Sequence, residues 1–444
     1  MSLAALAACS GDRGAPLVVP PEDQTSAAIC GVDFSDVTGA WGDFAPTRTV
    51  NVCAAGGCDA ATVADGVALA CDGSGADADV SLAPGVYREA LYVACPGQRL
   101  RLRAAAPPAT GEALAALPEA ERTVLDGSFV AADACAEVEH GALQIEAARG
   151  VWIEGLELRG YHRACQRATA YGLVIQGDGD GVDAVRVRAN YVHAIGVACA
   201  GGHATCDGDL NAHGVLIIGV EQRPIRAVEV SDNLLADLAL GQSEALALNG
   251  HVERFVVARN TVRDVDNIGI DVIGFENGLP WQAREGVVQD NVLVDLRCGN
   301  PTYASDTSND PCPSGSGRWP AAAGIYLDGA HGVCVRGNRV RGFDRGLEVA
   351  SERGGGTRQA SAIALCSNRL EASREHALEY GGSCDHGSNG ARDVRLVANT
   401  TVCPDGGAAC RDVDRDATCT TPLICEEAAG CLGPGPDGDA LACP

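Results

Sequence analysis

Residues 260–278, NTVRDVDNIGIDVIGFENG, contain one turn of the repeat that decides the fold. The motif Asn260-Thr-Val is followed nine residues later by a short β-branched strand, GIDVI at 269–273. The same Asn-x-(Val/Leu) motif recurs at Asn190, Asn233, Asn291, Asn338 and Asn368, with a weaker copy at Asn399. Similar strands occur at 172–176, 214–218, 245–249, 324–328, 346–350 and 377–381. Self-similarity at such a period indicates a repeat architecture.

Consecutive asparagines are 43, 27, 31, 47, 30 and 31 residues apart. A basic step near thirty residues, made of short strands without helical periodicity, predicts a coil of stacked strands. Columns of inward Ile, Leu and Val fill the interior of such a coil, and each turn is stabilised by its neighbours. We expect the asparagines to stack as a structural ladder of side-chain hydrogen bonds at one corner.

The repeats resemble the right-handed parallel β-helix of the pectate-lyase-like (pectin lyase superfold) superfamily, over roughly residues 75–405. The segment VSLAPGVYREALYV at 80–93 is similar to the first turns of that superfamily, where a Gly-x-Tyr-x-Glu turn (here Gly85, Tyr87 and Glu89) leads into the coil. The resemblance implies an all-β right-handed parallel β-helix. Members of the superfamily mostly cut or modify acidic polysaccharides.

The remaining sequence is expected to flank this coil. We assign residues 1–9 to the remnant of a truncated lipoprotein signal, 10–74 to a leader and N-terminal cap, 75–405 to the β-helix, and 406–444 to a Cys-rich C-terminal tail. Pro, Gly and Cys residues are frequent in the tail, which favours a structure joined by disulfides.

The formal net charge is −26, and all 33 basic residues are arginines. A nucleic-acid-binding protein needs a basic surface, so this class is excluded. Unaided binding of a polyanion is also disfavoured. The ligand is therefore either neutral or attached to the acidic protein through bridging cations. We expect a monomer.

The 21 cysteines indicate disulfides in an oxidising, extracytoplasmic compartment, because paired metal-finger spacings are missing. Cys9 follows Leu6-Ala7-Ala8 and resembles the lipidated cysteine of a bacterial lipoprotein, although a chance match in an alanine-rich chain is the alternative. A lipid on Cys9 would be the means of membrane attachment, because no segment is long enough to span a bilayer.

Two turns of the coil are longer than the rest. Asn190 and Gly214 are 24 residues apart and Asn291 and Gly324 are 33 apart, against nine and eight in regular turns. Two insertions therefore leave the coil at the same corner. Each contains a cysteine pair that we expect to close the loop, namely Cys199 with Cys206 and Cys298 with Cys312. Long loops on a rigid scaffold are frequent sites of function.

Strand alternation places a polar set on the outer face between these insertions. Aligned strands put Asp271, Tyr326 and Glu348 in one outward column and Asn249 and Asp328 in the next. This predicts an exposed ligand site, with solvated strand residues as the alternative. Further candidates for substrate contact are Trp281, Trp319, Arg284 and Arg318. His213 is a candidate base; for these five residues loop packing, solvent exposure or a structural role is the alternative.

Three functions are compatible with these residues. A lyase would abstract a proton beside a uronate carboxylate, with Ca²⁺ held by Asp271, Glu276, Asp328 and Glu348. A glycoside hydrolase would use Asp271 with Asp328 or Glu348 as paired carboxylates. The third function is non-catalytic, that of a surface lipoprotein that binds glycans or is structural.

Overall fold

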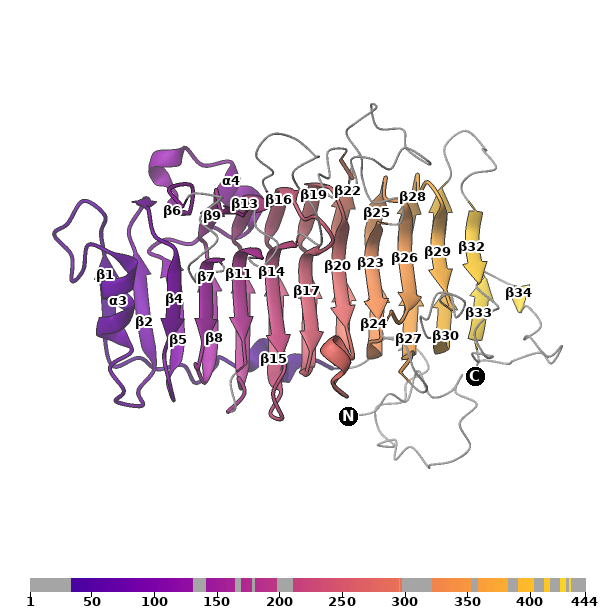
Figure 1. Ribbon diagram of the computed structural model, residues 1–444, viewed down its shortest axis with the longest axis horizontal. Helices are drawn as coiled ribbons and strands as arrows, with labels where there is room; N and C mark the ends of the chain where they lie inside the picture. Colours follow the sequence, from indigo (N-terminus) through magenta and orange to yellow (C-terminus); the bar gives the residue numbers. More distant parts are fainter. Residues whose placement is uncertain are drawn as a thin grey trace.

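The computed structural model describes residues 33–130, 141–163, 169–177, 180–197, 211–294, 296–297, 322–352, 358–381 and 390–402, and the strands at 411–415, 424–428 and 431–432. These residues form the predicted right-handed parallel β-helix, an elongated coil of three long sheets (Figure 1). The chain passes repeatedly from sheet B to sheet C to sheet A. No helix among the described residues is long and apolar enough to cross a membrane.

Sheet A is parallel apart from the antiparallel pairing of its last two strands. Its strands within the described residues are β1 (Thr49–Val52), β2 (Ala78–Leu82), β5 (Arg99–Ala104), β8 (Gly150–Glu154), β12 (Ala184–Arg188), β15 (Ile225–Ser231), β18 (Val252–Ala258), β21 (Arg284–Gln289), β24 (His331–Arg336), β27 (Ala360–Cys366), β30 (Ala391–Val397), β33 (Ile424–Ala428) and β34 (Cys431–Leu432).

Sheets B and C are parallel throughout the described residues. Sheet B contains β3 (Gly85–Tyr87), β6 (Thr123–Asp126), β9 (Glu157–Arg159), β10 (His162–Arg163), β13 (Tyr191–Val197), β16 (Leu234–Ala239), β19 (Thr261–Val265), β22 (Val292–Val294), β25 (Arg339–Arg341), β28 (Arg369–Glu371) and β31 (Thr400–Val402). Sheet C contains β4 (Leu91–Ala94), β7 (Gly141–Glu146), β11 (Ala170–Gln176), β14 (Ala212–Gly219), β17 (Glu244–Gly250), β20 (Ile268–Ile273), β23 (Ala323–Asp328), β26 (Arg345–Ala350), β29 (His376–Tyr380) and β32 (Arg411–Arg415).

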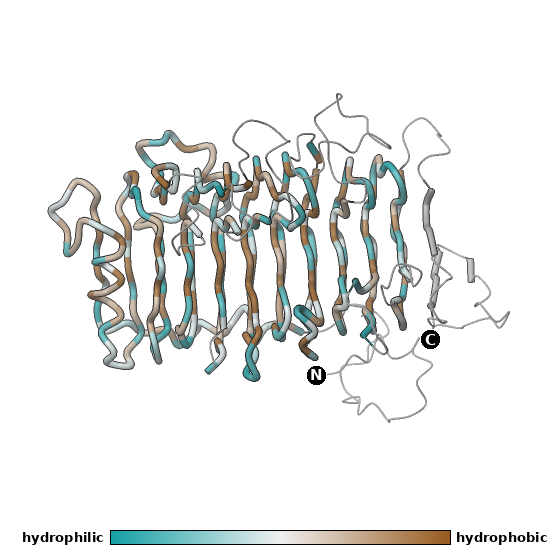
Figure 2. Tube along the Cα trace, in the orientation of Figure 1, coloured by the Kyte–Doolittle hydropathy of each residue, from teal (hydrophilic) through white to brown (hydrophobic). Residues whose placement is uncertain are grey.

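Aliphatic side chains from all three sheets fill the interior. In sheet C, Leu246, Ile270 and Ile325 lie side by side in register and are fully buried. Apolar and polar residues alternate along the strands, as the hydropathy colours show (Figure 2). Since successive side chains on a strand point to opposite faces, this alternation directs one set inward and leaves the other on the outside.

The predicted asparagine ladder is confirmed at the corner between sheets A and B. In a typical step, the side-chain amide of Asn260 donates to Oδ1 of Asn291 on the next turn at 3.0 Å. It also donates to the backbone carbonyl of Val230 on the previous turn at 2.9 Å. The backbone N–H of Asn260 also donates to Oδ1 of Asn291, at 2.9 Å. The residue before each ladder asparagine is left-handed, with φ between 53° and 65°.

The first turn of the coil explains the Gly-x-Tyr-x-Glu motif. Glu89 accepts the backbone N–H groups of Val63 and Ala64 at 2.8 and 3.0 Å, at the start of helix α3 (Val63–Ala70). These donors lack partners within the helix, so the carboxylate stabilises its first turn. The helix packs over the β1 end of the coil (Figure 1) and covers apolar side chains that would otherwise face water.

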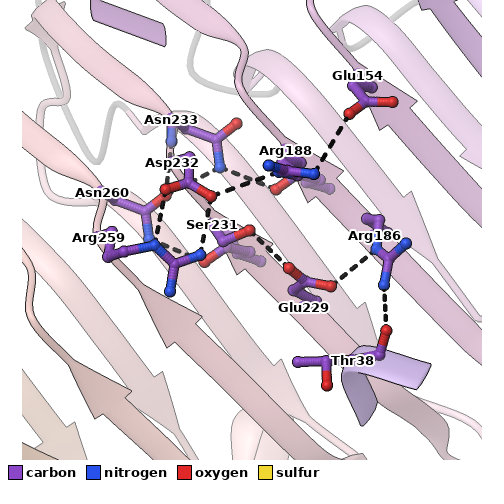
Figure 3. A network of polar contacts seen from close by, with 12 residues as sticks. Thr38, Glu154, Arg186, Arg188, Glu229, Ser231, Asp232, Asn233, Arg259 and Asn260 are labelled. Carbon is purple, nitrogen blue, oxygen red and sulfur yellow. Dashed lines mark hydrogen bonds and ion pairs between the residues drawn. The ribbon is translucent and has the colours of Figure 1, made fainter. Parts of the chain in front are cut away.

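The remaining short helices lie outside the coil. They are α2 (Ser35–Gly39), α4 (Gly111–Ala115), and the 3₁₀ turns η1 (Glu119–Glu121) and η3 (Glu276–Gly278). The segment that carries α2 crosses the outer face of sheet A, where Phe34 and Val37 pack against Val256 and Val287. An ion-pair network continues on this face, in which Arg186 contacts Glu229 at 2.8 Å and the carbonyl of Thr38 (Figure 3).

The coil extends beyond the predicted boundaries at both ends. Strand β1 pairs in parallel with β2, so sheet A begins at Thr49 rather than at residue 75. Strands β32 and β33 continue sheets C and A into the segment expected to be only a tail. Pairing of backbone groups with a neighbouring turn needs no Asn motif, which explains why the repeat pattern missed these turns.

Two disulfides lie at the N-terminal end, Cys53–Cys58 and Cys71–Cys95, and Cys334 is also disulfide-bonded. The predicted loop pairs lie outside the described residues, as does the candidate lipidation site: Cys199 with Cys206, Cys298 with Cys312, and Cys9. Both insertions do run from a strand of sheet B to a strand of sheet C, so they leave the coil at one corner, as predicted.

Candidate functional site

The outward column predicted for sheet C is confirmed by the strand register. Asp271 on β20 lies beside Tyr326 on β23, which lies beside Glu348 on β26, and Glu348 lies beside Glu379 on β29. Neighbouring strands in a sheet are about 4.8 Å apart, so these side chains form a continuous polar row. None of them belongs to the apolar interior.

Asp328 occupies the next outward column. It follows Tyr326 by two residues on β23 and therefore points to the same side of the sheet. Its Oδ1 accepts the backbone N–H of Glu352 at 2.7 Å. From the strand spacing and the rise of two residues, the Cα atoms of Asp271 and Asp328 are roughly 8 Å apart. Two carboxylates thus face the same space from adjacent strands.

These residues point outward, but they are not exposed, and that part of the prediction is wrong. The exposed fraction is 2% for Asp271, 3% for Tyr326, 3% for Asp328 and 7% for Glu348. Strand alternation determines the direction of a side chain, whereas exposure depends on what packs over it. The site is therefore a screened acidic cluster rather than an open surface.

Burial sets the protonation state of this cluster. It raises the pKa of the Asp271 carboxyl well above its ordinary value, and four neighbouring carboxylates raise it further: Glu244, Asp328, Glu352 and Glu348. Oδ1 of Asp271 is buried without a hydrogen-bond partner among the described residues. Burial also raises the pKa of Tyr326, and so do the neighbouring carboxylates of Asp328, Glu348, Glu352 and Asp271. The raised pKa of Asp271 favours the protonated form that a general acid requires.

Arg345, at the start of β26, lies between two members of the acidic row. Its Nη1 donates to Oε1 of Glu348 at 2.6 Å, and its Nε lies 2.7 Å from Oε2 of Glu379. Burial raises the pKa of Glu348 to about 7, although Arg345 opposes the shift. The guanidinium is thus occupied by protein carboxylates.

The cluster makes stability depend on pH. The pKa of Glu348 is about 7 in the folded chain and near 4.5 in the unfolded chain, so between these values the folded state binds more protons. We expect the free energy of unfolding to fall as pH rises from 5 to 8. Glu348 alone accounts for about 3 kcal/mol of that fall. Urea unfolding at several pH values measures it.

The matched variant is Glu348→Gln, which removes the titrating group and keeps the shape of the side chain. Its unfolding free energy should fall less between pH 5 and 8 than that of the wild type. Some fall should remain, because burial also raises the pKa of Asp266 to about 7 and that of Asp271. Wild-type stability that increases over this range would contradict the assignment.

His213 is not part of the acidic row. It lies on β14, two strands before Asp271, and its ring stacks on Tyr171 with 5.4 Å between centroids. Its Nδ1 is 3.1 Å from Oε2 of Glu244, yet neither atom completes a hydrogen bond. Since Glu244 is also one of the charges acting on Asp271, His213 is connected to the acids only through Glu244.

Two further candidates, Glu276 and Trp281, lie in the turn after β20. Glu276 lies in η3 and its Oε2 accepts the side-chain amide of Asn249 at 3.3 Å. Trp281 stacks on His251, with 4.4 Å between centroids and an interplanar angle of 4°. One face of the indole is therefore covered by protein.

Arg284 lies on β21 in sheet A and forms an ion pair with Glu253. The sequence makes Arg284 a candidate for substrate contact. The turn between β20 and β21 places it on a different sheet from Asp271, and its role in binding stays a prediction. The two remaining candidates for substrate binding, Arg318 and Trp319, lie outside the described residues.

The calcium site proposed from the sequence stays a prediction. Among the described residues, no group of three or more His, Cys, Asp or Glu side chains is placed to hold a metal ion. Glu276 hydrogen-bonds Asn249 on a different strand from Asp328 and Glu348.

Sequence reasoning missed Glu244, Arg345 and Glu352 as members of the site. Glu244 and Arg345 each begin a strand, one residue before the aligned repeats ALALN and GLEVA. Strict alternation would have turned both inward, because each lies two residues before an inward aliphatic residue, so the strand pattern could not have revealed this third outward column. Glu352 follows β26 and could not have been found from strand alternation.

No family model matches this chain. The uncharacterized protein YwoF of Bacillus subtilis (strain 168) is 30% identical over 266 residues, which are 60% of this chain and 50% of that protein. The chain thus spans half the length of the curated relative it matches.

Several solved structures share the fold. The GH136 lacto-N-biosidase from Eubacterium ramulus has a TM-score of 0.47 at 11% identity, covering 83% of this chain and 67% of that one. The periplasmic alginate epimerase AlgG has a TM-score of 0.32 at 11% identity, covering 76% and 72%. The catalytic unit of a GH87 α-1,3-glucanase from Streptomyces thermodiastaticus has 0.31 at 12%, covering 81% and 65%. Such low similarity concerns the fold alone.

Proposed function

We propose that the protein is an extracytoplasmic glycoside hydrolase. The observation that carries the proposal is the pair Asp271 and Asp328, which face the same space from adjacent strands and differ in their contacts. Burial raises the pKa of Asp271 and so favours its protonated form, whereas Oδ1 of Asp328 accepts a backbone N–H, an interaction that stabilises a carboxylate. A protonated and an ionised carboxyl group are the two partners that glycoside hydrolysis requires.

In this reaction Asp271 donates its proton to the glycosidic oxygen while the bond from that oxygen to the anomeric carbon breaks. Asp328 removes a proton from a water molecule, whose oxygen forms the new bond to the anomeric carbon. A separation of about 6.5–9.5 Å between the carboxyl groups leaves room for that water and is typical of inverting enzymes. In this base-catalysed route water attacks the face opposite the leaving group, so the expected product is the inverted anomer.

Calcium-assisted β-elimination is less well supported. The residues described offer no metal cluster, and Arg345 is occupied by Glu348 and Glu379. A lyase needs a cation beside the uronate carboxylate to acidify the proton that is removed. The hydrolase uses only groups that are present in the cluster.

The disulfides support an extracytoplasmic location, because disulfides are rare in reducing compartments. A lipid anchor at Cys9 and a monomeric state remain predictions from the sequence. Asp271 is only 2% exposed. A sugar therefore reaches it only after the atoms that screen it are displaced, and substrate binding includes this displacement.

A panel of polysaccharides and oligosaccharides tests the function. We expect new reducing ends without unsaturated uronates, at rates that calcium and a chelator do not change, and NMR of the first product should show the inverted anomer. Unsaturated products that depend on calcium would establish the lyase instead. Glycan binding without any cleavage would identify a non-catalytic binding protein.

A further inference from the structure

A second group of outward residues lies on sheet C beside the acidic row. Oδ1 of Asn249 and Oδ1 of Asp271 are buried there without a hydrogen-bond partner among the described residues. Nδ1 of His213 and Oε2 of Glu244 lie 3.1 Å apart but complete no hydrogen bond. The residues His213, Glu244, Asn249 and Asp271 are 9%, 9%, 7% and 2% exposed. Buried polar atoms almost always have partners, so several unpartnered atoms on one face indicate a missing ligand or water.

These polar atoms surround an apolar floor on strands β11, β14, β17 and β20. Four buried side chains form it, separately from the interior of the coil: Val174, Leu216, Ala247 and Ile273. Tyr171 and Ile218 pack against its edge. Apolar side chains with a few convergent polar groups are the usual lining of a small-ligand site.

The register gives this site its shape. Leu216, Ala247 and Asp271 are consecutive members of one outward column, so the floor leads directly to the proposed general acid. Asn249 lies two residues after Ala247 on β17, in the next outward column, beside Ile273. On the opposite edge His213 and Glu244 occupy the column at the strand starts, with Tyr171 stacked on His213. The floor residues are at most 4% exposed, so a pyranose ring reaches them by the same displacement that exposes Asp271, and it would then have hydroxyl partners on both edges.

The charges of the site select the kind of sugar. Glu244 and Asp271 supply carboxyl groups, whereas the one basic side chain among its described residues is His213, which already faces Glu244 at 3.1 Å. Arg345 lies on β26, where Glu348 and Glu379 occupy it. A uronate or sulfated sugar would find no available cation here and would face like charge.

We propose that this floor is a binding subsite for an uncharged pyranose residue, adjacent to the bond that is cleaved. The proposal rests on the hydrolase function for its position relative to the bond and on the unpartnered atoms for its existence. It departs from the acidic substrates that the superfamily resemblance implies. Hydroxyl groups of the sugar donate to Asn249, Glu244 and Asp271, while its C–H face lies on Ala247 and Leu216.

Calorimetry with the full-length Asp328→Asn variant measures binding without turnover. The probes are neutral gluco-, galacto-, xylo- and N-acetylhexosamine oligosaccharides, compared with oligogalacturonates and oligomannuronates. We expect at least one neutral probe to bind and the uronates to bind at least tenfold more weakly. Adding Asn249→Leu, which removes an acceptor and a donor, should raise Kd for the neutral probe roughly tenfold. Thr261→Leu, on the outer side of sheet B, is the control and should leave Kd unchanged.

Glu244→Gln tests the selection against charge. It removes a negative charge at the subsite, so discrimination against uronates should fall about tenfold, whereas Glu285→Gln on sheet A should not alter it. Urea unfolding confirms that each variant is folded. The subsite is overturned if no glycan binds, if uronates bind more tightly than neutral probes, or if Asn249→Leu leaves Kd unchanged.

The outcomes also separate this proposal from the hydrolase. Neutral binding that depends on Asn249 without any hydrolysis by the wild-type protein would retain the subsite and refute the hydrolase. Hydrolysis of uronate chains with no neutral binding would retain the hydrolase and refute the subsite.

Discussion

Asp328→Asn lowers kcat for the best hydrolysed glycan about 10³-fold, because general acid–base groups contribute 10²- to 10⁴-fold to such reactions. Asparagine keeps the shape of the side chain and its contact with the backbone N–H of Glu352, but it cannot accept a proton from water. The loss should appear in kcat rather than in KM, because water activation occurs in the transition state. Reducing-end release under saturating glycan measures it.

Asp271→Asn is the companion variant and affects proton donation. We expect a similar loss on natural glycans and a much smaller loss on aryl glycosides with good leaving groups, which depart without protonation. Because burial and neighbouring carboxylates raise the pKa of Asp271 and disfavour its charged form, an uncharged asparagine should leave stability near neutral pH unchanged or raise it.

Glu285→Gln on β21 is the matched control for catalysis, since Glu285 lies on sheet A. It should retain wild-type kcat. Loss of folding in Asp271→Asn or Asp328→Asn, seen by urea unfolding, would show that these acids are structural and that the site is assigned wrongly. Full activity in both variants would also contradict the assignment.

Asn291→Leu destabilises the protein by about 4 kcal/mol, since several buried groups lose partners that each contribute 1–3 kcal/mol. Oδ1 of Asn291 accepts the backbone N–H and the side-chain amide of Asn260 at 2.9 and 3.0 Å. Its own amide donates to the carbonyl of Val257 and to Asn338. Asn291 is 0% exposed, so water cannot replace these partners. Urea unfolding measures the change.

Asn399→Leu is the control for the ladder. Asn399 accepts from Asn368 at 2.9 Å, but it is only half-buried and lies last in the ladder. Water can reach its partners after substitution, so we expect a loss of about 1–2 kcal/mol. Equal losses for Asn291 and Asn399 would show that burial does not determine the strength of the ladder.

Much of the site was predictable because a stacked coil repeats its local environment. The alignment of GIDVI with GIYLD and GLEVA correctly placed Asp271 beside Tyr326 and Tyr326 beside Glu348. One shift in register would have turned all three inward, and the aliphatic residues on either side of Asp271 exclude that shift. The functional roles of these residues remain predictions.

Strand alternation gives no position for residues where the chain leaves the strands. Arg284, a candidate for substrate contact, is carried by the turn to sheet A, where it pairs with Glu253. Trp281 lies in the same turn and stacks on His251. The direction of a turn depends on contacts with neighbouring turns of the coil, which no local pattern contains.

The sequence by itself determined the architecture: the period of about thirty residues, the inward columns, the asparagine ladder and the outward direction of Asp271. These properties depend on residue spacing along the chain, because strand alternation and stacking act locally and repeat. Only the tertiary structure decided the chemistry of the site. The burial of Asp271, the contacts of Arg345 with Glu348 and Glu379, and the unpartnered atoms of Glu244 and Asn249 depend on neighbouring turns. The pKa of a carboxyl group responds to the water and charges around it, and both are set by packing across the coil.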